Sequence, residues 1–338
     1  MKMKISEKII KPSVWSWMKW VLVGLFCFLL LTGFFFGLPK CLSFLKDNAF
    51  VINQDTPIDT YGQMGDSYGI FNALFSGLAF VGVILTLFFQ WRDNRKRTVV
   101  EQFYKMLEVQ QKVISEITVS QVRRAKKDEE VATLKGRKAF VEYKIQLKYL
   151  FKAIKKVSIK GGFDLSDIDI ADISYSVFFY GSAPSWKPFM MEYLKDYSDT
   201  ERMVDLIIDQ LNAEKNYILS RPNQNYLSVY FRNMYNAIKL IDGCSYLNNK
   251  EKEDNIKMLR LQLSNAELYV LFFNVISRFG KKWVEKDYIS KYQLIQNLPS
   301  KYCDGYNPKD FFPTINFESD ELSLSPFKEK IVKREKDR

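Results

Sequence analysis

The stretch IFNALFSGLAFVGVILTLFFQW, from Ile70 to Trp91, decides the fold class of this 338-residue chain. It contains no charged residue, and its strongly polar members, Asn72 and Gln90, stand near its two ends. An α-helix needs about 20 predominantly apolar residues to cross the hydrocarbon core of a bilayer. The stretch therefore predicts a spanning helix at 68–91, with a buried core helix as the alternative.

A second apolar run, WVLVGLFCFLLLTGFFFGL at 20–38, is also free of charge. Its alternative interpretation is a secretory signal peptide, but it ends in FFFGLPKC, which is a poor cleavage site. Trp15, Trp17 and Trp20 are typical of an interfacial belt. We expect two transmembrane helices, at 20–38 and 68–91, which form a hairpin around a loop at 39–67.

The charges that flank these runs predict their orientation. Residues 1–19 carry five lysines against one glutamate, whereas the loop at 39–67 carries two lysines and four aspartates. The second run is followed at once by a basic group, namely Arg92, Arg95, Lys96 and Arg97. Because Lys and Arg are retained on the cytoplasmic side, both termini are expected in the cytoplasm and the loop at 39–67 outside.

The composition excludes several kinds of chemistry. The chain has no histidine, so it has no Ser-His-Asp triad, no Cys-His dyad and no His-ligated zinc. Its four cysteines lack metal-ligand spacing, and no phosphate-binding loop or dinucleotide fingerprint occurs. Of the net charge of +11, residues 1–19 carry +4, residues 92–97 carry +3, the loop at 39–67 carries −2 and residues 98–338 keep +6, which is a weak footprint for nucleic acid. We expect no cofactor, no catalytic motif and no support for a nucleic-acid partner.

The remainder of the chain predicts a mainly α-helical cytoplasmic domain at 92–300, followed by an irregular region with a basic tail at 301–338. Apolar residues recur there with helical periodicity. One helix is expected to continue directly from the second spanning segment, and Tyr175–Trp186 fits either a short strand or the end of a helix. The expected helices are 98–117, 138–157, 200–219, 227–246, 251–279 and 283–298.

The order of six segments resembles the AbiC-like family of phage abortive-infection proteins. The segments are GDSYGIFNALFSGLAFVGVILTLFFQ (65–90), EQFYKMLEVQQKVI (101–114), GRKAF (136–140), FFYG (178–181), YFRNMYNAIKLID (230–242) and RLQLSNAELYVLFFN (260–274). The resemblance implies a defence role in the bacterial inner membrane, but no particular reaction. Gln110 and Gln111 stand where relatives are expected to carry a histidine, which puts a His-dependent activity in doubt.

Small residues give the second spanning segment a side on which another helix could pack closely. Ala73 and Gly77 form a small-xxx-small pattern, which allows helix backbones to approach. This side predicts either assembly with a second copy of the chain or packing on the first spanning helix. Its members are Gly69, Ala73, Ser76, Gly77 and Gly82.

Polar residues interrupt the expected helix at 251–279 and suggest a second candidate site. Arg260, Gln262, Ser264, Asn265 and Glu267 fall in this otherwise apolar segment. They predict either a buried site for a ligand or an activating partner, or an internal network that ties helices together. Arg232 is expected to belong with them, with a carboxylate such as Glu267 as its candidate partner.

The segment DLSDIDIAD contains four aspartates, Asp164, Asp167, Asp169 and Asp172. They are the only cluster that suggests a metal ion, although the spacing is not that of an EF-hand. The alternative is a capped helix start, since Asp favours the N-cap and the first turn.

These observations lead to three functional hypotheses. The leading one is a membrane-anchored anti-phage protein that associates with the lipid bilayer and with further copies of itself. It would sense a trigger of phage or host origin through its cytoplasmic domain and halt the host cell by disturbing the membrane. The alternatives are a membrane-tethered, metal-dependent hydrolase or nuclease, and a non-enzymatic adaptor that docks another defence component.

Overall fold

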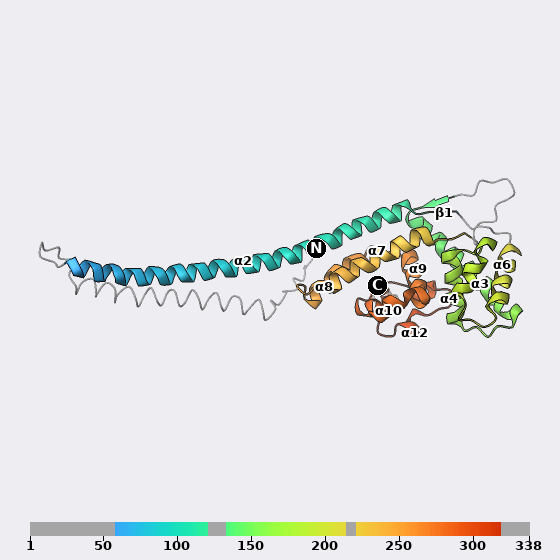
Figure 1. Ribbon diagram of the computed structural model, residues 1–338. Coiled ribbons are helices and arrows are strands. Elements are labelled where there is room, and N and C mark those ends of the chain that lie inside the picture. Colours follow the sequence, from blue (N-terminus) through green and yellow to red (C-terminus); the bar gives the residue numbers. More distant parts are fainter. Residues whose placement is uncertain (1–57, 121–132, 214–220, 319–338) are drawn as a thin grey trace, which may run out of the picture. The chain divides into compact units, whose positions relative to one another are not determined.

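The computed structural model describes residues 58–120, 133–213 and 221–318. The chain divides into two compact units, 1–86 and 87–338, and each is described by itself. The basic stretch 1–19, the expected spanning helix 20–38, most of the loop 39–67 and the tail beyond 318 lie outside the described residues. The two-helix hairpin is therefore not confirmed, whereas the mainly helical architecture is (Figure 1).

The longest element is helix α2, which runs without interruption over Ile58–Glu116. Its sequence contains no proline, the residue that most strongly interrupts a helix. The expected continuation of the second spanning segment into 98–117 is confirmed. Residues 58–67, which hydropathy placed in the loop, are helical because their polar side chains do not prevent helix formation.

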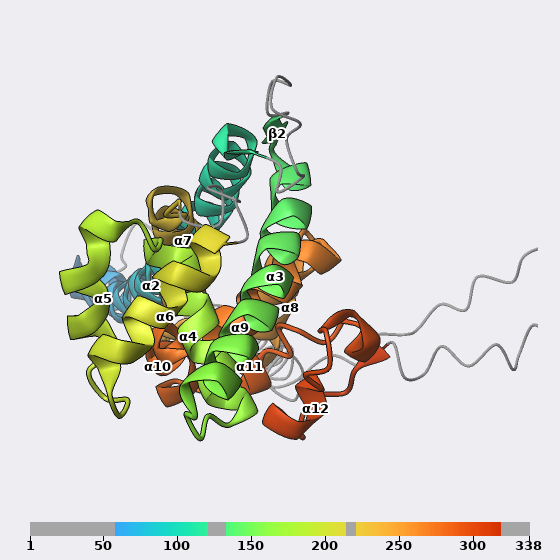
Figure 2. The same cartoon turned by 90° about the vertical axis from the view of Figure 1, so that its right-hand side faces the viewer.

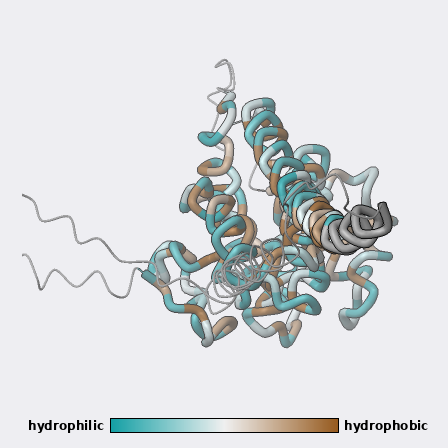
Figure 3. Tube along the Cα trace, turned by 90° about the vertical axis from the view of Figure 1, so that its left-hand side faces the viewer, coloured by the Kyte–Doolittle hydropathy of each residue, from teal (hydrophilic) through white to brown (hydrophobic). Residues whose placement is uncertain are grey.

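The domain in the second unit is a set of helices packed around α9, Asn265–Ile276. Every residue from Ala266 to Val275 is buried, which explains why this segment is apolar on all sides. Helix α3, Arg137–Gly161, packs against α9, against α4, Asp167–Tyr180, and against α6, Thr200–Ala213 (Figure 2). Most of these helices carry both hydrophobic and hydrophilic positions, as expected for amphipathic elements around a core (Figure 3).

Helix α7, Gln224–Asp242, and helix α8, Asn249–Arg260, complete the group of longer helices. Shorter elements connect or follow them: η1 Pro184–Trp186, α5 Lys187–Tyr193, η3 Arg278–Gly280, α10 Lys281–Glu285, α11 Tyr288–Lys291, η4 Ser300–Tyr302 and α12 Pro308–Phe311. The strands β1, Thr118–Ser120, and β2, Thr133–Lys135, form an antiparallel pair with Val119 opposite Leu134. The sequence pattern did not indicate this pair.

The structure corrects two of the expected helices. The predicted helix 251–279 is two helices, because Ser264 caps α9 and the chain turns between Arg260 and Asn265. The predicted helix 283–298 consists of the short helices α10 and α11 followed by turns, and Asp287 between them has a left-handed backbone with φ of 49°. The segment at 175–186 is the end of α4 followed by η1, so the strand alternative is excluded.

Candidate functional site

Polar side chains from four parts of the second unit meet at the domain end of α2. We call this group the central polar cluster, and its members come from α2, α3, α7 and the start of α9 with the link before it. They fall in four of the segments that resemble the AbiC-like family. The members are Gln110, Gln111, Arg137, Tyr230, Asn233, Gln262, Ser264 and Glu267.

Glu267 is the most deeply placed member, with a fully buried side chain. One carboxylate oxygen accepts hydrogen bonds from the Ser264 amide at 2.9 Å and the Ser264 hydroxyl at 2.6 Å, while the Ser264 Oγ accepts from the Glu267 amide at 3.3 Å. The other oxygen accepts from the Tyr230 hydroxyl at 3.3 Å. Burial, with Glu267 next in importance, raises the pKa of Tyr230 well above its usual value. Glu267 thus closes the N-terminus of α9 in a capping box and links it to α7.

Gln110 and Gln111, near the end of α2, connect that helix to its neighbours. The Asn233 side-chain amide donates to Gln110 Oε1 at 2.7 Å and to the carbonyl of Met106 at 2.9 Å. Gln111 Nε2 donates to Gln262 Oε1 at 2.8 Å, and Arg137 Nη2 donates to Gln111 Oε1 at 3.2 Å. These bonds tie α2 to α7, to the α8–α9 link and to α3, so they fix how α2 is held in the domain.

The polar residues predicted from sequence do not all meet. Gln262, Ser264 and Glu267 belong to the central polar cluster, whereas Asn265 is exposed in the first turn of α9. Arg260 donates to the carbonyls of Tyr292 and Gln293, at 3.5 and 3.2 Å, and burial lowers its pKa.

Arg232 is exposed on α7, so it does not occupy the place expected for a partner of Glu267. The buried carboxylate is held by Ser264 and Tyr230 instead. The cluster also contains five residues that the sequence did not place in it, namely Gln110, Gln111, Arg137, Tyr230 and Asn233, and no local pattern marks them. The capping-box pattern Ser264-Asn265-Ala266-Glu267 marks only the start of a helix.

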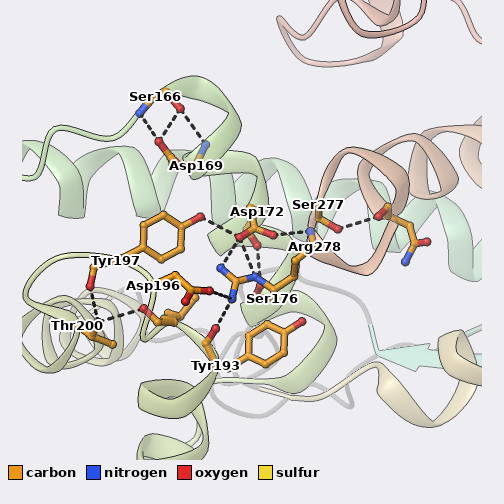
Figure 4. A network of polar contacts seen from close by, with 12 residues as sticks. Ser166, Asp169, Asp172, Ser176, Tyr193, Asp196, Tyr197, Thr200, Ser277 and Arg278 are labelled. Atoms are coloured by element: carbon orange, nitrogen blue, oxygen red, sulfur yellow. Dashed lines mark hydrogen bonds and ion pairs between the residues drawn. The ribbon is translucent and has the colours of Figure 1, made fainter. Parts of the chain in front are cut away.

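A second group surrounds Asp172, and we call it the Asp172–Arg278 cluster (Figure 4). The carboxylate of Asp172 accepts from the backbone amide of Arg278 at 2.8 Å, from Nε at 2.8 Å and from Nη2 at 2.6 Å. It also accepts from the Tyr197 hydroxyl at 2.8 Å. Arg278 Nη1 donates to the carbonyl of Tyr193 and lies 3.8 Å from Asp196. This cluster joins α4 to the start of η3 and to the segment after α5.

The surroundings hold Arg278 in its charged form. Burial alone would lower its pKa, but the hydrogen bonds and charge of Asp172 outweigh burial and raise it. The guanidinium also lies over the Tyr193 ring, 4.8 Å from its centroid. Burial, followed by the charge of Asp172, raises the pKa of Tyr197 as well. The arrangement is that of a structural ion pair, since the carboxylate that a metal would need is already engaged by the guanidinium.

The other predicted metal candidates lie apart from Asp172. Asp169 forms a capping box with Ser166, whose amide and hydroxyl donate to Asp169 Oδ2 at 2.9 and 2.5 Å. Asp164 and Asp167 are exposed. Within 58–120, 133–213 and 221–318, no group of three or more His, Cys, Asp or Glu residues is arranged to hold a metal ion. The capped helix start is therefore what this segment forms.

The apolar part of α2 carries the candidate helix-packing residues. In the part of the chain that the structure describes, α2 is the one helix that is long and apolar enough to cross a membrane, and none of its most apolar stretch is buried. A Cβ atom added at Gly69, Gly77 or Gly82 would meet no described atom within 4 Å. At about 100° per residue, Gly69, Ala73, Ser76 and Gly77 share one side of the helix, while Gly82 lies about 140° away from Gly77.

The part of α2 around Trp91 and Lys96 contacts the turn between α7 and α8 and the first turn of α8. Lys96 Nζ lies 3.0 and 3.2 Å from the two carboxylate oxygens of Glu251. Arg95 stacks on Trp91 at 5.6 Å, and Trp91 in turn packs edge to face on Tyr246 at 5.9 Å. Arg97 is exposed and Arg92 is half-buried. Within the second unit, α7 therefore runs antiparallel to α2 and α8 runs parallel to it (Figure 1).

Together, these features define a mainly helical protein in which a domain is built around one end of a long helix whose other part is apolar and exposed. Residues 222–302 match the family model described as "putative phage abortive infection protein". The match confirms the resemblance to AbiC-like proteins and includes α7, α8 and α9, hence five members of the central polar cluster and Arg278. No curated protein and no solved structure gave a significant match.

Proposed function

We propose that this protein is a phage-defence protein anchored in the bacterial inner membrane, which senses infection through its helical domain and halts the host cell. The family match supports the defence role. The observation that carries the membrane assignment is the exposed apolar surface of α2, which continues without a break into the domain that bears the match.

The energetics of this surface favour a bilayer. Large apolar side chains between Leu74 and Trp91 are about half exposed, for example Phe80 at 66% and Leu87 at 57%. Burying such a side chain is worth about 1.5–3 kcal/mol relative to leaving it in water. The lipid phase supplies this burial over the whole stretch, and the basic residues after it, including Lys96, favour the cytoplasmic side for the domain.

The contacts of α2 suggest how the domain acts on the membrane segment. The same helix contacts the α7–α8 turn near Trp91 and the central polar cluster near Gln110 and Gln111. A trigger of phage or host origin that shifts α7 or the α8–α9 link would therefore move α2 as well. We infer that the cluster transmits the state of the domain to the spanning part of the helix.

Assembly of several copies through α2 completes the proposal. Between positions 69 and 77, the side formed by Gly69, Ala73, Ser76 and Gly77 has no bulky side chain, and such small-xxx-small sides allow close helix contacts in membranes. In this scheme, triggered helices associate and disturb the bilayer, which stops growth before phage progeny are released. The metal-dependent hydrolase gains no support from the described residues, because Asp169 and Asp172 serve the capping box and the ion pair.

The proposal is tested by challenging cells that express the protein with phage at low and high multiplicity of infection, while a dye reports membrane potential. Survival at low multiplicity, collapse at high multiplicity and depolarisation before lysis are the expected results. Protection with an unchanged membrane potential would refute the membrane-disturbance mechanism, and loss of all protection across a broad phage panel would refute the defence role.

Two variants make the test specific for helix assembly. Gly77→Leu is expected to abolish protection, and Gly82→Leu, on another side of the same helix, is expected to retain it. Neither new side chain meets a described atom at its Cβ position, so both proteins should be produced normally. Equal behaviour of the two variants would contradict the proposed packing side.

A further inference from the structure

A cavity of about 350 Å³ opens beside α3, and its lining includes no member of the central polar cluster or of the Asp172–Arg278 cluster. Three segments form its wall: the middle of α3, the start of α4 and the turn that follows η4. Pockets that hold small molecules have volumes of about 300–1,000 Å³, so this one suits a compact ligand. Its lining residues are Phe151, Lys152, Lys155, Asp167, Ile170, Asp304, Gly305 and Tyr306.

The positive wall of the cavity belongs to α3. This helix contains eight Lys and Arg residues and a single acidic residue, Glu142. Lys152 and Lys155 are exposed, and no ion pair joins either of them to another described residue. Lys148, one turn earlier, is already paired with Asp304 at 2.9 Å. The two lysines at the cavity are therefore available to an anion, and lysine is a common binder of phosphate groups.

The floor of the cavity is aromatic. Phe151 and Tyr306 pack on each other with their ring centroids 5.3 Å apart, and both also contact Phe273 of α9. The Tyr306 hydroxyl donates to the carbonyl of Asp167 at 3.0 Å, which fixes the ring against the start of α4. Phe151 is only 8% exposed, so a flat group in the ligand would stack mainly on the half-buried ring of Tyr306. Every nucleobase has a π-face that stacks on aromatic side chains.

Carboxylates stand on the remaining wall. Asp167 is exposed at the cavity, and Asp304 accepts a hydrogen bond from Tyr269 at 2.9 Å in addition to its pairing with Lys148. Carboxylates next to a bound nucleotide accept hydrogen bonds from ribose hydroxyls. Gly305 between the walls has φ of +101°, and a Cβ atom there would meet no described atom within 4 Å, so the opening is not blocked.

We propose that this cavity binds a nucleoside phosphate, with its phosphate against Lys152 and Lys155, its base on the Phe151–Tyr306 floor and its ribose facing Asp167. The lysines match the phosphate, the aromatic floor matches the base and the carboxylate matches the ribose of one nucleotide. The volume of the cavity suits a small molecule. The proposal does not rest on the proposed defence function, because its test measures binding to the purified protein.

The experiment uses the full-length chain in detergent micelles and titrates it with AMP by isothermal calorimetry, with adenosine and inorganic phosphate as separate probes for the two halves. AMP is expected to bind at least about tenfold more tightly than either half. The double variant Lys152→Gln/Lys155→Gln is expected to weaken the binding of AMP at least about tenfold and to leave the binding of adenosine unchanged. Lys160→Gln, an exposed lysine of the same helix outside the cavity, is the matched control and should bind AMP as the wild type does.

Three results would overturn the proposal. The first is no measurable heat for AMP at millimolar concentration with a protein whose thermal unfolding is normal. The second is AMP binding that the double lysine variant does not weaken, or that Lys160→Gln weakens equally. The third is a ten-nucleotide DNA strand that binds much more tightly than AMP, which would assign the lysines of α3 to a nucleic-acid strand instead.

Discussion

Replacing Asp172 by alanine should destabilise the domain more than any other change in the aspartate-rich segment. The substitution removes the partner of Arg278 and leaves a guanidinium whose side chain is only 23% exposed without its carboxylate. It also removes the acceptor of the Tyr197 hydroxyl and of the Arg278 backbone amide.

The size of the effect follows from these contacts. Breaking a buried ion pair by removing one partner costs about 3–5 kcal/mol, because the remaining charge is left in a poorly solvated place. For a domain of roughly 150–250 residues, 1 kcal/mol corresponds to a shift in Tm of about 2–4 °C. Asp172→Ala is therefore expected to lower the Tm by roughly 6–20 °C.

The measurement is thermal unfolding of the full-length protein in detergent, followed by circular dichroism. Asp164→Ala is the matched control, since Asp164 is exposed on the same segment and should change stability by less than about 0.5 kcal/mol. If Asp172→Ala melted within about 2 °C of the wild type, the ion pair would not contribute as argued. If Asp164→Ala abolished phage defence at normal stability, the metal-dependent alternative would regain support.

Three further predictions follow from local features. Ser264→Ala should cost about 1 kcal/mol in the free energy of unfolding, because Ser264 caps α9, while Asn265→Ala beside it should be nearly neutral in the same urea titration. Burial acts to raise the pKa of Glu251, but the Asn248 amide and Lys96 outweigh burial and lower that pKa below its usual value of 4.5. The stabilising contribution of Glu251 is therefore present above pH 4.5 and is lost as the pH falls through the lowered pKa. The difference in stability between wild type and Glu251→Gln should be larger at pH 7 than at pH 3, and a constant difference would contradict this prediction. Burial raises the pKa of the Cys303 thiol to about 12, so little reactive thiolate is present at pH 8. Peptide mapping should therefore find that iodoacetamide leaves Cys303 unlabelled in the native protein and labels it in urea. Labelling of Cys303 in the native protein would show that the site opens.

The parts of the fold that sequence predicted best are those set by local patterns. The apolar stretch and the stripe after it predicted the continuous helix α2, and the aspartates predicted the capped start of α4. The break at Ser264 was missed because the apolar residues on both sides have the same helical periodicity, so only the capping-box pattern marks the boundary. The strand pair β1–β2 is three residues long on each side, too short to produce a pattern of alternation.

The candidate sites were predictable only in part, for a different reason. Glu267 and Ser264 are close in sequence, and their participation in a buried network was expected from their place in an apolar segment. Asp172 and Arg278 are 106 residues apart, and nothing in either local sequence indicates the other. The expected pairing of Arg232 with Glu267 illustrates the limit, because charge complementarity alone does not reveal which side of α7 faces the core.

The continuous helix α2 also works as a ruler. In the proposed membrane-anchored arrangement, Trp91 would stand at the membrane boundary. Gln110 is 19 residues further along the helix, which at 1.5 Å per residue is a rise of about 28 Å. A folded domain of 100 residues has a radius of gyration of about 13 Å. Under that proposal, a protein that engages the central polar cluster would have room for about one small domain between the cluster and the lipid headgroups, and a larger assembly would have to present a protruding segment.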